Sequence, residues 1–510
     1  MIIDELKYKI LQQFGFPPTQ EQAHALEVFA EFLTDRDPHA VMILRGSAGT
    51  GKTTLSGAIV RILKEIHQKV MLLAPTGRAA KVFSLNSGSP AYTIHRRIYR
   101  EKSFSGVEGQ FNLNDNLYTD TLFMVDEASM IANMGLGGMS FGSGCLLDDL
   151  VHFVYQGRND RLLLIGDKAQ LPPVGEEESP ALHAAMLEGY GLKVYECDLN
   201  EVLRQSEESG ILYNATMIRQ MITHDDITQL PKIHFAGYSD IKPMPGAELI
   251  EALADSYHHV GLDDTIVVTR SNKRANIFNQ GIRNMVLDRE EELSQGDILM
   301  IVKNNYYWME EERKKIKEIE ERRVKSEGTE PGTATHKVPS SKFQVQSNDI
   351  PAFLANGDRA KVLKVRRRID LYGFRFATLL LQFPDYGNYE LEATVLLDTL
   401  TSEAPALTHE QQEQLFHQIE EDYQDIPLKA DRMKAIRQDQ FFNALQVKFA
   451  YAVTCHKAQG GQWAHVYVDQ GYMTDDMLNP DYIHWLYTAF TRATEMLYLV
   501  NWPETQTVQC

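Results

Sequence analysis

Cysteine is scarce in this sequence. The 510 residues include four cysteines, Cys145, Cys197, Cys455 and Cys510, and no two of them form a C-x-x-C pair. A disulfide framework or a zinc ribbon needs closely spaced cysteine pairs, so this spacing excludes both. Few and scattered cysteines are typical of proteins from a reducing compartment. We therefore expect a cytoplasmic protein.

Long apolar runs are also missing. No stretch approaches the roughly 18 uninterrupted apolar residues that a membrane-spanning helix needs. The first ten residues, MIIDELKYKI, carry Asp4 and Glu5 where a secretion signal has positive charge followed by a long apolar core. We expect no membrane partner.

The chain has no excess of positive charge. Its 51 basic and 70 acidic residues give a formal net charge of −19. A basic footprint over the whole surface, which would indicate nucleic-acid binding, is therefore lacking, although a groove can be locally positive on an acidic protein. With 43% apolar and 24% charged residues, the composition is that of an ordinary globular protein. The length predicts about three or four domains.

Short Val/Ile/Leu-rich runs, each bounded by Gly, Pro or Asp, alternate with amphipathic stretches near both ends of the chain. Such continuous apolar runs are typical of parallel strands covered by helices on both faces. The alternation predicts two α/β domains with an insertion in the second. The runs are 40–46, 69–76, 121–129, 161–167, 265–270, 445–456, 464–470 and 496–501.

The middle of the chain has a different pattern. Residues 309–323 hold six acidic and six basic side chains, which predicts a solvated helix with i,i+4 ion pairs Glu310–Lys314, Glu311–Lys315 and Glu318–Arg322. Residues 325–349 are rich in Ser, Thr, Gly and Pro and indicate a loop or linker, and the Gly-rich residues 135–144 indicate another loop. Residues 356–399 alternate with period two and predict a small antiparallel β unit.

A phosphate-binding loop is the strongest motif. A G-x-x-x-x-G-K-T sequence follows a strand and opens a helix, so its backbone N–H groups can surround phosphates at the helix N-terminus. Lys52 would reach the β- and γ-phosphates, and Thr53 would ligate Mg²⁺. The loop consists of Gly46, Ser47, Ala48, Gly49, Thr50, Gly51, Lys52 and Thr53.

Two further motifs follow later strands of the same predicted sheet. Asp126 would hold magnesium through water and Glu127 would polarise the attacking water; a helix N-terminal cap is the alternative reading of these two acids. Gln170, in Gly166–Pro173 (GDKAQLPP), is a neutral amide suited to sensing the γ-phosphate. The alternative interpretation of this motif is a loop that simply ends at its prolines.

These three motifs, in this order, resemble those of the superfamily 1 helicases, specifically the superfamily 1B branch that includes RecD and Dda. The resemblance covers roughly residues 15–300 and 350–500. Further segments resemble motifs of that branch: Pro18–Gln22, Ala74–Ala80, Thr93–His95, Glu201–Gln205, Tyr451–Gly460 and Tyr487–Ala493.

The resemblance implies additional ATP contacts. Gln22 corresponds to the adenine-reading glutamine, and Thr54 continues the phosphate loop. Arg204 and Arg492 correspond to arginines directed at the γ-phosphate, the second from the distant domain, which makes hydrolysis depend on closure of the cleft. Gln462 stands where relatives usually have Glu; an amide hydrogen-bonds but carries no charge.

The resemblance also implies single-stranded DNA contacts. Pro75, Thr76 and His95 would contact the strand from the first domain, and Thr454 and His456 from the second. Hydroxyl and imidazole groups hold phosphates with little dependence on base identity. The alternative for both histidines is a satisfied interior position. Residues 101–118 occupy the place of a strand-separating pin, with Phe104 or Phe111 as a wedge; a packed loop phenylalanine is the alternative.

The expected fold class is α/β, with two RecA-like parallel-sheet domains and a small inserted SH3-like β subdomain. The expected segments are a first motor domain at 1–205, the start of the second at 206–308, a charged helix and linker at 309–349, the inserted β region at 350–440 and the rest of the second motor domain at 441–510.

The resemblance implies an ATP- and Mg²⁺-dependent DNA helicase. It would move 5′ to 3′ on single-stranded DNA and act at single-strand/duplex junctions, in recombination or repair and with protein partners of those processes. Two alternatives stay open. One is a nucleotide-switched DNA-binding ATPase that does not unwind, and the other is a P-loop phosphotransferase.

Overall fold

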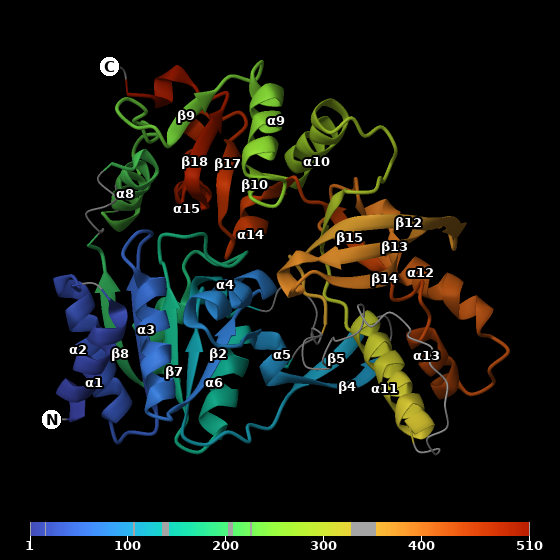
Figure 1. Cartoon of the computed structure of the whole chain (residues 1–510), viewed down its shortest axis with the longest axis horizontal. Coiled ribbons are helices and arrows are strands. Elements are labelled where there is room, and N and C mark those ends of the chain that lie inside the picture. Colours follow the sequence, from blue (N-terminus) through green and yellow to red (C-terminus); the bar gives the residue numbers. More distant parts are fainter. Residues whose placement is uncertain are drawn as a thin grey trace. The chain divides into compact units, whose positions relative to one another are not determined.

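The computed structural model describes residues 2–15, 17–105, 108–134, 142–201, 208–224, 227–327 and 353–508. The chain forms two compact units (Figure 1): unit 1 comprises Met1–Asp288 and Tyr451–Cys510, and unit 2 comprises Arg289–Ala450. Among the described helices, none is long and apolar enough to cross a membrane.

The first sheet of unit 1 has six parallel strands in the order β3-β2-β6-β7-β1-β8. Its central strands, β1, β6 and β7, are buried along their whole length, as their unbroken apolar sequences predict. The strands are β1 (Ala40–Gly46), β2 (Lys69–Ala74), β3 (Ala91–Thr93), β6 (Thr121–Val125), β7 (Arg161–Gly166) and β8 (Lys193–Leu199).

Helices cover both faces of this sheet. One apolar core lies under α1 (Ile2–Phe14), α2 (Gln20–Thr34) and α3 (Lys52–Glu65), and the other lies under α5 (Ile94–Ile98) and α6 (Leu146–Gln156). The remaining elements are α4 (Gly77–Ser87), α7 (Ala184–Gly189) and the antiparallel hairpin of β4 (Tyr99–Ser105) and β5 (Glu108–Leu113).

The second sheet of unit 1 has five parallel strands in the order β16-β10-β17-β18-β9. They are β9 (Ile241–Met244), β10 (Thr265–Thr269), β16 (Ala452–Thr454), β17 (Trp463–Asp469) and β18 (Ala493–Val500). Its helices are α8 (Gly210–Thr223), α9 (Leu249–His259), α10 (Asn272–Gly281), α14 (Cys455–Ala458) and α15 (Pro480–Phe490). The two sheets of unit 1 are called below the first and the second motor domain.

Unit 2 is built on a closed five-stranded barrel. Two β-bulges, between Val362 and Lys364 and between Val365 and Arg367, interrupt the register of β12 with β13, and bulges bend a strand as barrel closure requires. The strands are β11 (Ile298–Ile301), β12 (Arg359–Leu371), β13 (Phe374–Phe383), β14 (Tyr389–Leu396) and β15 (Leu445–Phe449), with helices α11 (Tyr307–Glu327), α12 (His409–Asp422) and α13 (Lys429–Arg437). The predicted fold class, two RecA-like parallel-sheet domains with a small inserted β subdomain, is confirmed.

Short helical segments complete the described elements. They are the 3₁₀ segments η1 (Ala128–Met130), η2 (Pro180–Leu182), η5 (Pro384–Tyr386), η6 (Leu397–Thr399), η7 (Asp475–Met477) and η8 (Glu504–Gln506), and the π-helical segment η4 (Ile282–Val286).

Three sequence expectations need correction. The run 445–456 is not one strand of the second motor domain: its first half is β15 of the barrel and its second half is β16. Because both halves are buried, one apolar run concealed two strands. The barrel also takes β11 from the range 206–308 that was assigned to the second motor domain.

Helix α11 includes the predicted charged helix, but its described ion pairs have i,i+3 spacing. Lys314 pairs with Glu311 and Lys315 pairs with Glu312, each at 2.7 Å. An i,i+3 neighbour is as close on a helix surface as an i,i+4 neighbour, so rotamer choice decides between them. The predicted loops at 325–349 and 135–144 lie largely outside the described residues.

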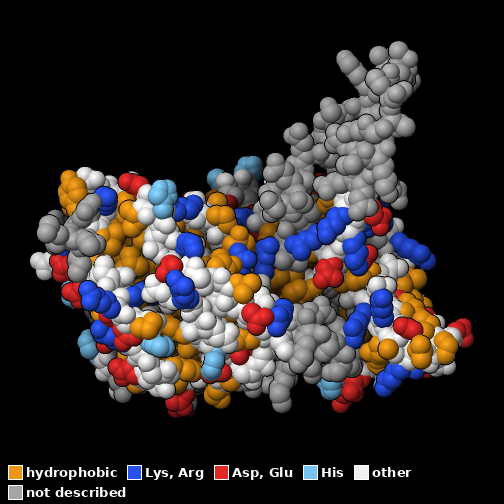
Figure 2. All heavy atoms as spheres, turned by 90° about the horizontal axis from the view of Figure 1, so that it is seen from below, with side chains coloured by type: hydrophobic (Ala, Val, Ile, Leu, Met, Phe, Trp, Pro, Cys, Tyr) orange, Lys and Arg blue, Asp and Glu red, His pale blue; other side chains and the backbone are white. Residues whose placement is uncertain are grey.

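Although the net charge is negative, parts of the surface are locally basic. On the face drawn in Figure 2, Lys and Arg side chains lie in several groups among acidic and apolar ones.

Candidate active site

The predicted phosphate loop connects β1 to α3. Gly49 and Gly51 have φ values of +78° and +80°, in the left-handed region that glycine adopts without strain. At Gly46 a Cβ atom would lie 2.9 Å from side-chain atoms of Thr50 and Lys52. The loop therefore needs glycine at these positions for its close curve.

The phosphate-loop lysine lies inside this curve. Lys52 Nζ donates hydrogen bonds to the carbonyl oxygens of Gly46 and Ser47, the latter at 2.9 Å. Thr53 and Thr54 follow on the first turn of α3 and are exposed. Backbone N–H groups of the loop, the helix N-terminus and the ammonium group thus form an anion-binding site.

Gln22 supports the loop from α2. Its side chain is 1% exposed; its Nε2 donates to the Thr50 carbonyl at 2.8 Å, and its Oε1 accepts from the Thr19 N–H at 3.0 Å. The second of these bonds belongs to the capping box that begins α2. Gln22 therefore fixes the position of the loop, and its predicted contact with adenine stays a prediction.

Two adjacent carboxyl groups follow β6. Glu127 has a φ of +54°, a strained conformation for a residue with a Cβ, and its N–H donates to Asp126 Oδ1 at 2.9 Å. Burial, and next the neighbouring charge of Glu127, raise the pKa of Asp126 to about 7. Carboxylate and hydroxyl oxygens are ligands that Mg²⁺ prefers. Asp126 and the Thr53 hydroxyl therefore fit a magnesium ion, whose charge would favour the ionised form of Asp126.

Gln170 lies in the loop that follows β7. Its side chain is 7% exposed, and, within the described part of the chain, its Oε1 has no hydrogen-bond partner. A buried amide oxygen without a partner is costly and calls for an explanation. A γ-phosphate contact, which the sequence predicts for Gln170, would give this amide a partner.

Helix α15 of the second motor domain reaches the phosphate loop through a tyrosine. The Tyr487 hydroxyl accepts from the Ala48 N–H at 3.0 Å and donates to Asp167 Oδ2 at 2.6 Å. Burial and the Asp167 charge raise the pKa of Tyr487 well above its ordinary value, so the hydroxyl stays protonated. One phenol thus links the second motor domain to two motifs of the first.

Three more hydrogen bonds fix the loop after β7 to the second motor domain. The Leu171 N–H donates to Thr488 Oγ1 at 2.7 Å, and Gln459 Nε2 donates to the Leu171 carbonyl at 2.8 Å. His484 Nδ1 lies 2.9 Å from the Ala169 carbonyl. The loop that carries Gln170 is therefore held by residues of both predicted C-terminal motifs.

The predicted arginines are placed differently. Arg492 is 3% exposed and donates to the Thr488 carbonyl at 3.0 Å, the Gly461 carbonyl at 3.1 Å and Thr491 Oγ1 at 3.1 Å. All three acceptors belong to its own domain, so the structure does not bring Arg492 to the phosphate loop. Arg204 lies outside the described residues.

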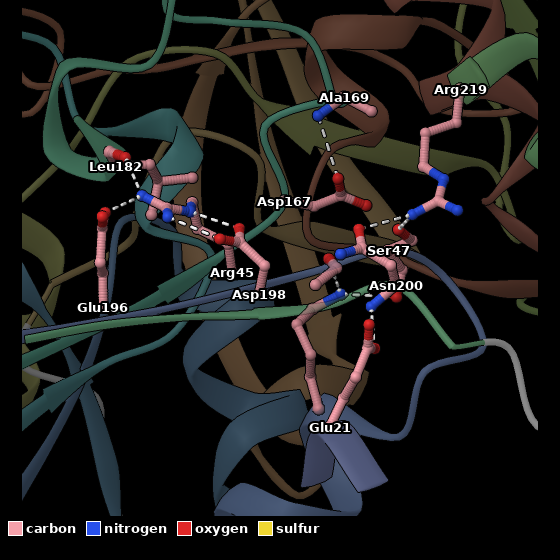
Figure 3. A network of polar contacts seen from close by, with 12 residues as sticks. Glu21, Arg45, Ser47, Asp167, Ala169, Leu182, Glu196, Asp198, Asn200 and Arg219 are labelled. Atoms are coloured by element: carbon pink, nitrogen blue, oxygen red, sulfur yellow. Dashed lines mark hydrogen bonds and ion pairs between the residues drawn. The ribbon is translucent and has the colours of Figure 1, made fainter. Parts of the chain in front are cut away.

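An arginine that the sequence did not single out does contact the loop. Arg219 of α8 donates from Nη1 to Ser47 Oγ and, at 3.1 Å, to Asn200 Oδ1 (Figure 3). It lines a cavity of about 960 Å³ together with Ser47, Asp167, Asn200 and His484. Arg219 belongs to none of the recognised motifs, and a single arginine on an amphipathic helix gives no signal of its own.

The predicted DNA-contact motifs of the two motor domains lie next to each other. A Cβ atom on Gly460 would lie 3.3 Å from Thr76 Oγ1 and 3.0 Å from Ala79 Cβ. Thr76 begins α4 and accepts from the Ala79 N–H at 3.2 Å, and Pro75 precedes it, half-buried. Thr454 precedes α14 at the corresponding position, without a capping hydrogen bond from its side chain. The hydroxyls of Thr76 and Thr454 therefore lie at helix N-termini, and helix N-termini favour phosphate oxygens.

The two candidate histidines differ in exposure. His456 is exposed on α14, whereas His95 is half-buried on α5, with its ring centroid 5.6 Å from that of Tyr99. Burial lowers the pKa of His95 to about 4, so its imidazole is neutral at pH 7. The structure thus favours the interior alternative for His95 more than for His456.

Gln462 also lies at a junction between the motor domains. Its side chain is exposed, and its backbone carbonyl accepts from Arg78 Nη2 at 3.1 Å. The Arg78 guanidinium lies 4.1 Å from the ring centroid of Trp463, a cation–π contact. The feature of Gln462 that the structure describes is therefore this backbone contact.

Within the range predicted to form a strand-separating pin, β4 and β5 pair as an antiparallel hairpin, and the role of this hairpin as a pin stays a prediction. Phe111 packs against the core of the first motor domain, so it is not a free wedge. The side chain of Phe104 lies outside the described residues.

Parts of the chain that hold this site are similar to known proteins. The model of the AAA domain matches residues 18–230, and that of the UvrD-like helicase C-terminal domain matches residues 449–500. The ATP-dependent RecD2 DNA helicase of Deinococcus radiodurans is 32% identical over 157 residues, 31% of this chain. The ATP-dependent DNA helicase dda of Enterobacteria phage T4 is 24% identical over 302 residues, 56% of this chain. The resemblance to the superfamily 1B helicases is confirmed.

The chain spans 18% of the length of the RecD2 relative and 60% of the length of the Dda relative. A solved structure of a Bacteroides Pif1 helicase in complex with ADP-AlF3 and ssDNA aligns with a TM-score of 0.43 and 13% identity, over 97% of this chain and 95% of that one. The roles that superfamily 1B resemblance gives to single residues of this chain stay predictions.

Proposed function

We propose that this protein is an ATP- and Mg²⁺-dependent DNA helicase that moves along single-stranded DNA. Unit 1 is its motor. The observation that carries the proposal is the hydrogen-bond bridge from Ala48 through the Tyr487 hydroxyl to Asp167, because it joins the phosphate loop to a helix of the other motor domain. A phosphotransferase that used the loop alone would have no need of this second domain.

ATP would bind with its phosphates in the loop Gly46–Thr53, where Lys52 neutralises their charge. Magnesium, held by Thr53 and Asp126, would supply charge neutralisation at the phosphates. Glu127 would accept a hydrogen bond from the attacking water and draw its proton, and Gln170 would hydrogen-bond the terminal phosphate. Each group acts on charge that develops during phosphoryl transfer.

Closure would couple this chemistry to movement. Tyr487, Thr488 and Gln459 hold the loop after β7 from the second motor domain, so a change at the terminal phosphate would alter contacts between the domains. Arg204 and Arg492 would complete the site on closure, the latter after it leaves its present carbonyl partners.

The strand would be bound next to the junction of α4 and α14. Pro75, Thr76 and His95 would contact it from the first motor domain, and Thr454 and His456 from the second. Opening and closing of the cleft would then change the spacing of two strand-binding surfaces. By resemblance we propose 5′ to 3′ travel, single-strand/duplex junctions as substrates, a cytoplasmic location and a role in recombination or repair together with proteins of those processes.

The test is ATP turnover with and without single-stranded DNA. Because the strand and the nucleotide would share one hinge, turnover should rise at least about tenfold with the polynucleotide. Turnover that polynucleotide does not change would support the phosphotransferase instead. Stimulated turnover without strand separation would support a nucleotide-switched DNA-binding ATPase.

A further inference from the structure

Arg219 stands out because it carries a positive charge at the phosphate loop and comes from the second motor domain. Its helix, α8, packs against α15 and β18, while its guanidinium contacts Ser47 of the loop and Asn200 after β8. It is close enough to Tyr487 for its charge to act on that phenol. Two side chains of the second motor domain therefore converge on adjacent loop residues, Ser47 and Ala48.

The hydrogen bonds of Arg219 leave its charge unbalanced. Both partners are neutral oxygens, its Nε is buried without a hydrogen-bond partner, and no ion pair is found for it within the part of the chain that the structure describes. A partly buried guanidinium without an anion is unfavourable, because desolvation weakens its hydration and no opposite charge replaces it.

The neighbouring arginine of the same cavity shows the contrast. Arg45 is 7% exposed, and its guanidinium is paired with Asp198 at 2.6 and 2.7 Å and with Glu196 at 2.8 Å (Figure 3). Its charge is satisfied by the protein itself. Arg219 lines the same cavity as Gly46 and Ser47 of the phosphate loop, and within the described residues its hydrogen-bond partners are Ser47 and Asn200, neither of which is a carboxylate.

We propose that Arg219 binds the terminal phosphate of ATP and acts as a catalytic arginine that α8 supplies from the second motor domain. The proposal rests on the proposed ATPase function and adds a residue to it. Water oxygen would attack the terminal phosphorus, the bond to the bridging oxygen would break and ADP would leave. The water proton would pass to Glu127, and the Arg219 N–H groups would stabilise the charge on the transferring phosphoryl oxygens.

The test uses the full chain with Arg219→Ala and Arg219→Lys, and Gln220→Ala as the matched control, since Gln220 is the exposed neighbour on the same helix. Turnover is measured with saturating single-stranded DNA, and binding is measured with fluorescent ATP and ADP analogues. We expect turnover of Arg219→Ala to fall on the order of 10³-fold, with weaker binding of the triphosphate and unchanged binding of the diphosphate. Arg219→Lys should lie between, because lysine keeps the charge and loses the planar fork.

Added guanidinium ion distinguishes loss of a catalytic charge from loss of a structural contact. It should restore part of the turnover of Arg219→Ala and leave Gln220→Ala unchanged, which loss of a structural contact would not do. Turnover within a few fold of the unsubstituted protein, or equal losses of ATP and ADP binding, would overturn the proposal, the second by assigning Arg219 to loop support through Ser47. If Arg219→Ala does not fold, Arg219→Lys gives the same comparison. An unsubstituted protein with no ATP turnover would refute the proposed function itself, and this inference with it.

Discussion

Replacement of Tyr487 by phenylalanine removes one hydroxyl from the junction of the motor domains. That hydroxyl makes a partly buried hydrogen bond with the Ala48 N–H at 3.0 Å and a buried one with Asp167 at 2.6 Å. A neutral hydrogen bond contributes about 0.5–1.5 kcal/mol and one to a charged group about 1.5–3 kcal/mol. Asp167 keeps a second donor, the Ala169 N–H at 3.0 Å, so the lower half of the combined range applies, about 2–3 kcal/mol.

This free energy belongs to the arrangement that the structure describes, in which Tyr487 joins the two motor domains, since separating the domains exposes both partners to water. Tyr487→Phe should therefore shift the equilibrium between this joined arrangement and a separated one roughly 30- to 150-fold toward the separated one. The matched control is Tyr482→Phe on the same helix. The Tyr482 hydroxyl donates to Gln470 Oε1 at 2.6 Å, inside the second motor domain, so its loss costs stability without affecting closure.

The assay is single-molecule energy transfer between dyes on the two motor domains. Cysteines introduced at Leu85, which is 72% exposed, and at Met285, which is 66% exposed, would carry the dyes after Cys145 and Cys510 are replaced by serine. Tyr487→Phe should populate a low-transfer state in the absence of nucleotide, and Tyr482→Phe should match the unsubstituted protein. Identical transfer distributions for the two variants would refute the reasoning.

Three further predictions concern residues of the first motor domain. Lys52→Ala should abolish ATP hydrolysis in a steady-state assay, because the ammonium group that lies inside the curve of the loop is lost; full activity would remove this loop as the ATP site. Glu127→Gln should bind ATP but lose turnover by about 10²–10⁴-fold, and unchanged turnover would show that Glu127 does not activate water. The pKa of His95 is lowered by burial to about 4, against roughly 6.5 in the unfolded chain. The unfolded state therefore binds more protons between these values, so the unfolding free energy should fall by up to about 3 kcal/mol as the pH drops from 7 to 4. Urea denaturation of His95→Gln should lack this component, and an equal pH dependence in both proteins would contradict the burial.

Much of the fold follows from local sequence. Strands β1, β6 and β7 are uninterrupted apolar runs, and such runs have few stable placements other than the centre of a parallel sheet. The phosphate loop is equally local, because its glycines, Lys52 and the following helix are contiguous. The run 445–456 was misassigned because apolarity reports burial and does not report which sheet a strand joins.

The parts of the site that the sequence did not reveal depend on contacts between distant segments. Tyr487 and Arg492 lie in one predicted motif, yet the tyrosine reaches the phosphate loop and the arginine bonds to carbonyl groups of its own domain. Which side chain of α15 faces the loop depends on the rotation of that helix, and no local pattern encodes that rotation. Arg219 was missed for the same reason.

The central claim is that ATP hydrolysis in this two-domain site drives strand separation. Its most direct measurement is unwinding of duplexes that carry either a 5′ or a 3′ single-stranded tail, with and without ATP. The account predicts separation of the 5′-tailed duplex only, and only when ATP is present. Hydrolysis that single-stranded DNA stimulates, with neither duplex separated, would contradict it.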